Sequence, residues 1–262
     1  MIKLAVSGAC GRMGREIIKV IEADAELRLS SAVEHEGNPL LGDEIVLGVK
    51  VSADIISALR GADVLIDFSG AAGTMSRLDA YRSEGCPLII GSTGFTETER
   101  REVLALAETL PLFISSNMSV GVSVAARLVS IAAGALDNSF DIEVFEAHHR
   151  HKKDAPSGTA LTLAVAAAKG RGLSLSSSAV YNREGVTAVR SSEEIGFQVL
   201  RGGDIVGEHT VFFCGEGERV EITHRATSRS IFAQGAIKAA KWLHQKANGL
   251  YGMNDLLGLK SE

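Results

Sequence analysis

Apolar residues in the first 115 positions occur in short runs that alternate with segments of helical periodicity. The runs predict strands at Lys3–Ser7, Leu29–Val33, Val64–Phe68, Leu88–Ile90 and Leu112–Ile114. Two of the intervening segments, Met13–Ala23 and Thr96–Thr109, have the composition and spacing of helices. Strands that alternate with helices in this way predict a parallel, doubly wound sheet.

The pattern changes near residue 117. We predict a helix over about Val122–Leu136, a strand at Asp141–Ala147 and an alanine-rich helix at Ala160–Ala168. From 178 to 228 helical periodicity is absent, and apolar runs separated by glycine turns predict a β-meander of three strands, Ile195–Leu200, Val206–Phe213 and Arg219–Thr223. A final helix at Ile231–Lys246 is expected to return to the first domain.

We therefore expect an α/β protein with two domains. A Rossmann-like, doubly wound parallel sheet would occupy residues 1–118 plus 229–262 and bind a dinucleotide. Residues 119–228 would form an α+β domain for substrate binding and oligomerisation, with a largely antiparallel open sheet.

Composition narrows the class of protein. Apolar residues make up 45% and charged residues 23% of the chain, which is a globular balance and argues against general disorder. The net charge of −5 would repel a polyanion, so we expect no nucleic-acid partner. We find no apolar stretch of the ~20 residues that a bilayer requires and no secretion signal, so we expect a cytoplasmic protein without a membrane partner. Cys10, Cys86 and Cys214 are widely spaced, which argues against a disulfide framework or a zinc knuckle.

A glycine-rich segment, Gly8–Gly14, follows the first predicted strand and opens the first helix. At such a turn, backbone N–H groups and the positive end of the helix dipole can hold a pyrophosphate. The spacing G-x-x-G-x-x-G has Ala9 where the usual dinucleotide fingerprint carries its first glycine, and glycines that merely permit a tight turn are the alternative. Glu34 ends the second strand 20 residues later, where a carboxylate can accept hydrogen bonds from ribose hydroxyls. This context favours dinucleotide binding.

Polar loops follow two later strands, at Gly91–Phe95 and Ser115–Gly121. Ligands of open parallel sheets bind outside the carboxyl ends of the strands. Each loop alone could be a plain connection. Because two such loops stand at consecutive strand ends, we expect both to lie on the side of the sheet that binds the cofactor.

The densest chemical cluster is Glu146–Thr159, which holds three histidines within four positions. Histidine exchanges protons near neutral pH, and lysine or arginine can hold a carboxylate. Ser157–Thr159 precede the alanine-rich helix, whose free N–H groups can form a second anion site. The alternatives are a solvated basic loop and a metal site; for the latter the H-H-x-H spacing lacks a cysteine or carboxylate partner, and we expect no metal.

With these motifs in place, the chain closely resembles the 4-hydroxy-tetrahydrodipicolinate reductase family, also called dihydrodipicolinate reductases, along essentially its whole length. The segment E-A-H-H-R-H-K-x-D-A-P-S-G-T at Glu146–Thr159 is the most specific match, and Gly203–Thr210 is another. The resemblance implies hydride transfer from NAD(P)H to a cyclic, unsaturated dicarboxylate in diaminopimelate and lysine biosynthesis.

The resemblance also implies roles for individual residues. His148 and Lys152 would be the acid/base pair, with Lys152 as the proton donor, and His149, Gly158 and Thr159 would hold the substrate carboxylates. The cofactor would be held by Gly8, Ala9, Cys10, Gly11, Arg12, Met13, Glu34, His35, Gly91, Ser92, Thr93, Ser115, Ser116, Asn117 and Met118.

The cofactor preference depends on Glu34 and His35. Many relatives have arginine after the acidic residue, where this chain has His35. Without that fixed cation the charge of Glu34 would repel the 2′-phosphate of NADPH, so we expect NADH to be favoured, with NADPH as the weaker alternative.

The resemblance further implies a homotetramer in which the open sheets meet. An open sheet with the apolar residues Val211, Phe212, Phe213 and Val220 has an exposed face or edge that another subunit would cover. Two other functions stay open at this stage. One is a non-catalytic dinucleotide sensor whose histidine segment serves a partner protein, and the other is a two-domain dehydrogenase of another small acid.

Overall fold

The computed structural model describes residues 1–259, and the chain divides into two compact units. The first unit contains Met1–Ser119 and the segment that begins at Ser230, and the second contains Val120–Arg229. The functions expected of the two units remain predictions at this point.

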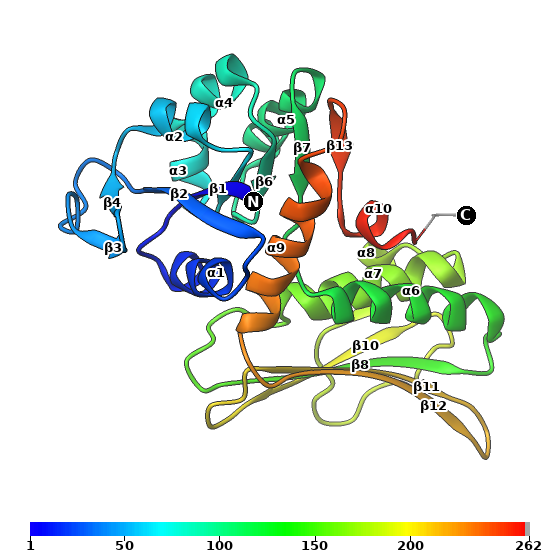
Figure 1. Cartoon of the computed structure of the whole chain (residues 1–262). Coiled ribbons are helices and arrows are strands. Elements are labelled where there is room, and N and C mark those ends of the chain that lie inside the picture. The colour runs from blue at the N-terminus through cyan, green and yellow to red at the C-terminus, as the bar shows by residue number, and fades with distance from the viewer. Residues whose placement is uncertain (260–262) are drawn as a thin grey trace. The chain divides into compact units, whose positions relative to one another are not determined.

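The first unit is built on a sheet with the strand order β13-β7-β6-β5-β1-β2-β4-β3 (Figure 1). All neighbouring strands are parallel except β3 and β4, which form an antiparallel pair. The strands are β1 (Ile2–Ser7), β2 (Leu27–Val33), β3 (Glu44–Val46), β4 (Val49–Ser52), β5 (Val64–Asp67), β6 (Leu88–Ile90), β7 (Pro111–Ile114) and β13 (Gly249–Tyr251). The five predicted strands are confirmed, and the doubly wound parallel sheet with them.

Helices cover both faces of this sheet. They are α1 (Arg12–Glu22), α2 (Ile55–Gly61), α3 (Ala71–Ser76), α4 (Leu78–Glu84), α5 (Glu97–Ala105), the 3-10 turn η1 (Leu106–Glu108), α9 (Ser230–Leu243) and α10 (Met253–Leu257). Helices α1 and α9 pack against each other, whereas α2 packs on β2 and α4. The predicted helix over Thr96–Thr109 is shorter than expected: Thr96 caps α5 in a capping box with Glu99, and the last turn tightens into η1.

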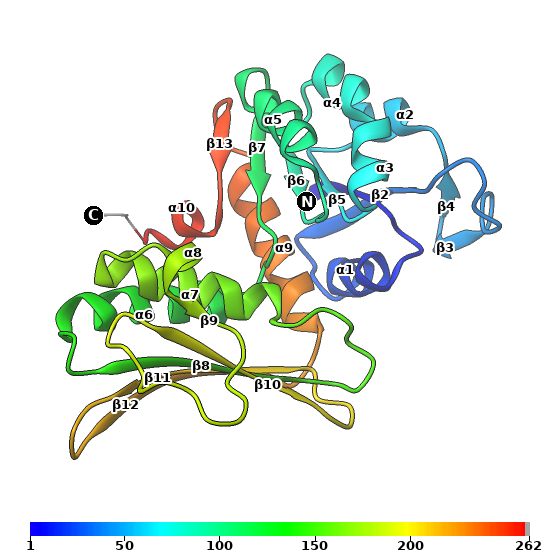
Figure 2. The same cartoon turned by 180° about the vertical axis from the view of Figure 1, so that it is seen from behind.

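The second unit contains a mixed sheet with the order β12-β11-β8-β10-β9. Its strands are β8 (Asp141–His148), β9 (Ala179–Val180), β10 (Ile195–Arg201), β11 (Gly207–Cys214) and β12 (Arg219–Ala226). Strand β10 runs parallel to β8, and β11 runs antiparallel to both β8 and β12. Figure 2 shows β9 and β10 from behind.

The predicted meander is therefore wrong in its first pairing, and the sheet is mixed rather than largely antiparallel. Strand β8 lies between β10 and β11. The connection between those two strands crosses the end of β8, where the N–H of Gly202 donates to the carbonyl of His148 and the N–H of His149 donates to that of Ile205. A glycine turn indicates a reversal of the chain but does not determine whether the strands it joins are neighbours.

Helices α6 (Val120–Ala135), α7 (Gly158–Arg171) and α8 (Leu175–Ser178) belong to this unit. Helices α6 and α7 approach closely at Gly170, where a Cβ atom would lie 2.2 Å from the carbonyl oxygen of Ser130. Their apolar faces pack with Val144, Val211 and other strand residues in one core.

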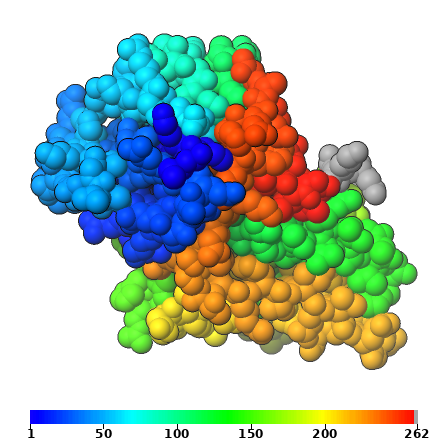
Figure 3. All heavy atoms as spheres, in the orientation of Figure 1, coloured from blue at the N-terminus to red at the C-terminus, as the bar shows by residue number. Residues whose placement is uncertain are grey.

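Two of the four apolar residues expected on an exposed face of this sheet lie in the core instead. Val211 and Phe213 are fully buried with the residues of α6 and α7, so neither can cover a partner. Phe212 is half-buried and Val220 is 39% exposed. Val220 belongs to β12, the edge strand whose atoms lie at the surface in amber in Figure 3.

Candidate active site

A cavity of about 390 Å³ lies at the carboxyl ends of the parallel strands in the first unit. It is lined by Met13, Phe68, Gly70, Gly91, Ser92, Thr93, Ser115, Ser116, Asn117, Met118 and Phe232. The structure thus brings Met13 together with both polar loops that the sequence singled out. The sequence did not identify Phe68, Gly70 or Phe232, because single aromatic residues at a strand end or a helix start carry no distinctive pattern.

Two glycines allow the cavity wall to close. The ring of Phe68 lies on Gly91, where a Cβ atom would come within 2.1 Å of the ring. A Cβ atom on Gly235 of α9 would lie 1.7 Å from the carbonyl oxygen of Met118. The contact at Gly235 is with backbone and leaves no room for a side chain, whereas a side chain at position 91 would displace the ring of Phe68.

A buried carboxylate shapes the loop after β5. Asp67 accepts hydrogen bonds from the backbone N–H of Ser69 at 2.8 Å and from the hydroxyls of Thr74 and Tyr81 at 2.7 and 3.0 Å. Burial and the neighbouring Asp67 charge raise the pKa of Tyr81, which keeps its hydroxyl a donor. This network holds the loop that carries Phe68 and Gly70.

The glycine-rich loop adopts the close turn that its sequence predicts. Gly8 has a φ of +77°, and a Cβ atom on Gly14 would lie 2.2 Å from the carbonyl oxygen of Gly8. Helix α1 begins at Arg12 and has no side-chain cap at Gly11. Its first N–H groups are therefore suited to an anion.

Glu34 is buried beside this loop, and its Oε1 accepts a hydrogen bond from the N–H of Cys10 at 2.8 Å. His35 next to it is exposed. The structure thus brings Glu34 to the loop Gly8–Arg12. Met13, which follows this loop, lines the 390 Å³ cavity. The loop Gly8–Arg12 itself, Glu34 and His35 do not line it.

In the second unit, His148 is buried at the end of β8 and is paired with a carboxylate. Its Nδ1 lies 2.6 Å from Oε2 of Glu146, which is completely buried on the same face of the strand. Burial lowers the pKa of His148, and Glu146 offsets part of this effect. His148 is therefore a neutral imidazole at neutral pH.

Arg201 neutralises this buried carboxylate. Its guanidinium donates two hydrogen bonds to Glu146, at 2.7 and 2.8 Å, and one to the carbonyl of Asp154 at 2.6 Å. Although burial acts to raise the pKa of Glu146, hydrogen bonds from Arg201 and His148 hold it below its usual value. Glu146 is therefore ionised.

The start of α7 is organised by the same carboxylate. The N–H of Ser157 donates to Glu146 at 3.0 Å, and the hydroxyl of Ser157 caps the helix by accepting from the N–H of Ala160 at 3.1 Å. His209 lies 2.9 Å from that hydroxyl, and burial lowers its pKa to about 4. At Gly158 a Cβ atom would meet open space, so the helix N-terminus is accessible to an anion.

The other predicted site residues surround this helix start. Lys152 is partly exposed, and its ammonium lies 2.8 Å from a carboxylate oxygen of Asp154. His149 is half-buried, with Nε2 3.4 Å from the guanidinium of Arg229. Thr159 occupies the first turn of α7 and is half-buried. Together these residues provide cations, neutral imidazoles and backbone donors, which suit a carboxylate ligand that also exchanges a proton.

Glu146, Arg201 and His209 had no role that could be predicted from the sequence pattern. The contact between Glu146 and His148 could have been predicted, since residues two apart on a strand share a face. Arg201 and His209 lie more than 50 residues away and come near only through the pairing of β10 and β11 with β8.

Neither a membrane span nor a metal centre is found among residues 1–259. No helix in this part of the chain has the length and apolar character to cross a bilayer. No three histidine, cysteine, aspartate or glutamate residues within it are arranged to hold a metal ion.

Comparison with known proteins gives matches along the whole chain. The model of the N-terminal part of dihydrodipicolinate reductase matches residues 2–118, and that of the C-terminal part matches residues 121–257. A 4-hydroxy-tetrahydrodipicolinate reductase of Thiobacillus denitrificans is 48% identical over 265 residues, covering 99% of each chain. One from Anaeromyxobacter dehalogenans is 49% identical over 267 residues, with the same coverage.

Solved structures show the same fold. A dipicolinate-bound dihydrodipicolinate reductase from Paenisporosarcina has a TM-score of 0.79 at 22% identity, covering 97% of this chain and 98% of that one. An amine dehydrogenase from Mycobacterium smegmatis has a TM-score of 0.59 at 12% identity and covers 100% and 97%. At these identities the likeness concerns the fold alone.

Proposed function

Because this chain belongs to the dihydrodipicolinate reductase family, we propose that it reduces 4-hydroxy-tetrahydrodipicolinate to tetrahydrodipicolinate with NAD(P)H, in diaminopimelate and lysine biosynthesis. The observation that carries this proposal is the cluster at the start of α7, where the ion-paired Glu146 holds His148 beside an open helix N-terminus. A dianionic ring substrate fits such a site because backbone donors and cations converge on it.

The substrate site is assigned to the second unit. The N–H groups at Gly158 and Thr159 hold a carboxylate at the N-terminus of α7, and His149 contributes a further polar contact. Lys152 donates the proton that neutralises the ring after reduction, and its positive charge stabilises the electron pair that forms beforehand. His148 completes the acid/base pair.

The cofactor site is assigned to the first unit. A nicotinamide dinucleotide supplies the hydride when bound. The N–H groups in the first turn of α1 would hold the pyrophosphate, because those of Gly8–Gly11 already donate hydrogen bonds within the chain. Glu34 would accept hydrogen bonds from the ribose, and the cavity lined by Gly91–Thr93 and Ser115–Met118 would take the nicotinamide end.

The direct test is NAD(P)H oxidation by the purified protein in the presence of freshly generated dihydropyridine dicarboxylate. We expect steady oxidation that depends on this substrate. A protein that binds the dinucleotide but leaves it unoxidised would be a sensor, and one that prefers an amino or hydroxy acid in a substrate profile would be another two-domain dehydrogenase. Either result would overturn the proposal.

For the cofactor we expect NADH to be favoured over NADPH in kcat/KM near pH 7.5. Glu34 is buried and accepts a hydrogen bond from the N–H of Cys10, so its carboxylate is placed beside the glycine-rich loop, whereas exposed His35 lacks the guanidinium that binds a phosphate through two hydrogen bonds. In His35→Arg a charge-assisted contact of ~1.5–3 kcal/mol should raise kcat/KM for NADPH about 10- to 100-fold.

Steady-state kinetics with both cofactors near pH 7.5, for the wild type and His35→Arg, checks this expectation. His244→Arg adds the same charge just after α9, in the same unit, and should leave the cofactor ratio unchanged. A wild-type preference for NADPH near pH 7.5 would contradict the assignment of Glu34 and His35.

We propose a homotetramer formed through the open sheets of the second unit. Phe212 and Leu200 remain available on this sheet, since Phe212 is half-buried and Leu200 is 41% exposed. Light scattering at micromolar concentration should give four times the chain mass, and Phe212→Glu should lower it. Leu47→Glu makes a similar change at an exposed residue of the first unit and should not. A wild-type monomer would contradict the proposal.

A further inference from the structure

His148 has two ring nitrogens, and the structure treats them differently. Nδ1 lies 2.6 Å from Oε2 of Glu146, whereas no hydrogen bond to Nε2 is present among residues 1–259. Nε2 faces the start of β11 at Gly207, where a Cβ atom would lie 3.0 Å away. Glycine at this position keeps a side chain off Nε2.

The ionisation of Glu146 determines where the proton of His148 lies. Glu146 is completely buried and accepts two hydrogen bonds from Arg201, so it is a carboxylate with no proton to donate. The short contact to His148 therefore requires that Nδ1 carry the hydrogen. In a neutral imidazole the other nitrogen, Nε2, then holds a lone pair.

We propose that Glu146, held by Arg201, is a positioning residue that fixes the proton of His148 on Nδ1 and leaves Nε2 as an acceptor in the reaction. The inference rests on the proposed function for the role of His148, but the tautomer itself does not. The two members of the acid/base pair then have different roles: Lys152 gives the proton, and Nε2 of His148 accepts a hydrogen bond. A resting His148 with a lone pair at Nε2 cannot itself be the donor from that nitrogen.

Five charged or titratable groups surround His148 and determine its response to pH. Glu146 lies on the same strand, His149 follows directly in the chain, Lys152 lies on the following loop, and Arg201 stands at the end of β10. His209 lies on β11, with its imidazole ring 5.1 Å from that of His148. Of these only Glu146 favours the imidazolium, because the cations of Lys152 and Arg201 oppose it.

The tautomer can be measured on the wild-type protein without substrate by ¹⁵N NMR of labelled histidines, with His148→Gln to assign the resonances. We expect a protonated Nδ1 and an unprotonated Nε2 at pH 7.5. A His148 protonated at Nε2 would overturn the proposal, even in a fully active reductase. Conversely, a failed reductase assay would leave this measurement valid.

The consequence for catalysis is tested with Glu146→Gln, whose amide can also donate to Nδ1 and so allows the Nε2–H tautomer. We expect kcat to fall by at least about tenfold and by no more than the roughly 10²–10⁴-fold that a positioned acid or base supplies, with KM for NADH unchanged. Loss of the Glu146 charge should also move the acidic limb of the kcat profile to lower pH.

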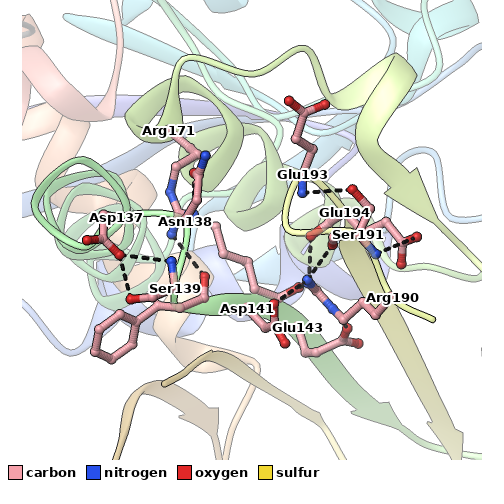
Figure 4. Close-up of polar contacts among 12 residues, drawn as sticks. Asp137, Asn138, Ser139, Asp141, Glu143, Arg171, Arg190, Ser191, Glu193 and Glu194 are labelled. Carbon is pink, nitrogen blue, oxygen red and sulfur yellow. Dashed lines mark hydrogen bonds and ion pairs between the residues drawn. The ribbon is translucent and has the colours of Figure 1, made fainter. Parts of the chain in front are cut away.

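A matched control is available on the same strand. Glu143 is also ion-paired, to Arg190 at 3.2 Å (Figure 4), but it faces away from His148. Glu143→Gln should leave the His148 resonances, kcat and the pH profile unchanged. If Glu146→Gln gave the same unchanged values, or lowered kcat without altering the His148 spectrum and the pH profile, Glu146 would have only a structural role.

Discussion

Lys152→Ala is expected to lower kcat by about 10²–10⁴-fold, the usual contribution of a positioned general acid. The ammonium of Lys152 lies in the loop before α7 and is held 2.8 Å from Asp154. Alanine removes both the proton and the positive charge that stabilises the electron pair on the reduced ring. The affinity for NADH should hardly change, because the cofactor is assigned to the first unit. Steady-state kinetics together with a fluorescence titration of NADH separates the two effects.

Two further variants distinguish the role of the proton from that of the charge. Lys152→Arg keeps the charge, but a guanidinium does not release its proton at neutral pH, so this variant should also be slow. Lys153→Ala removes the exposed neighbouring lysine and should retain wild-type turnover. Near wild-type kcat for Lys152→Ala at saturating substrate would exclude Lys152 as the proton donor.

The parts of the fold that could be predicted are those in which a local pattern coincides with burial. Strand β6 has its predicted bounds, Leu88–Ile90, because three buried apolar residues stand between Pro87 and Gly91. Strands β3 and β13 are three-residue segments without a single buried residue, so neither has the buried apolar core that marks β6. Pairing partners are set by contacts between distant segments, which is why the meander was wrong although its strands were present.

In the candidate site, too, the residues within one segment could be predicted, whereas those brought in from distant strands could not. His148, Lys152 and the start of α7 lie within one short segment and were predicted together. Arg201, which neutralises Glu146, is 55 residues away from it in the chain, and its position depends on the parallel pairing of β10 with β8. The sequence could therefore suggest which residues handle protons but not which tautomer the fold imposes.

Arg201→Met is expected to lower the free energy of unfolding by about 3–5 kcal/mol at pH 7, because it leaves a buried carboxylate without its cation. The side chain of Glu146 is completely buried and that of Arg201 is only 20% exposed, so water cannot replace the guanidinium easily. The hydrogen bonds from His148 and from the N–H of Ser157 remain, which places the loss at the lower end of this range. Urea unfolding at several pH values measures it.

The pH dependence identifies the cause. In the wild type the lowered pKa of Glu146 gives stability that is present above the ordinary glutamate pKa, about 4.3, and is lost as the pH falls further. In Arg201→Met the uncompensated carboxylate takes up a proton more readily, so the difference from wild type should be largest near pH 7 and shrink towards pH 4. Arg201→Met combined with Glu146→Gln removes the buried charge and should recover much of the loss. Arg225→Met breaks an exposed pair with Glu208 and should change stability by less than about 1 kcal/mol. A similarly small, pH-independent effect of Arg201→Met would show that Glu146 does not depend on Arg201 for its charge.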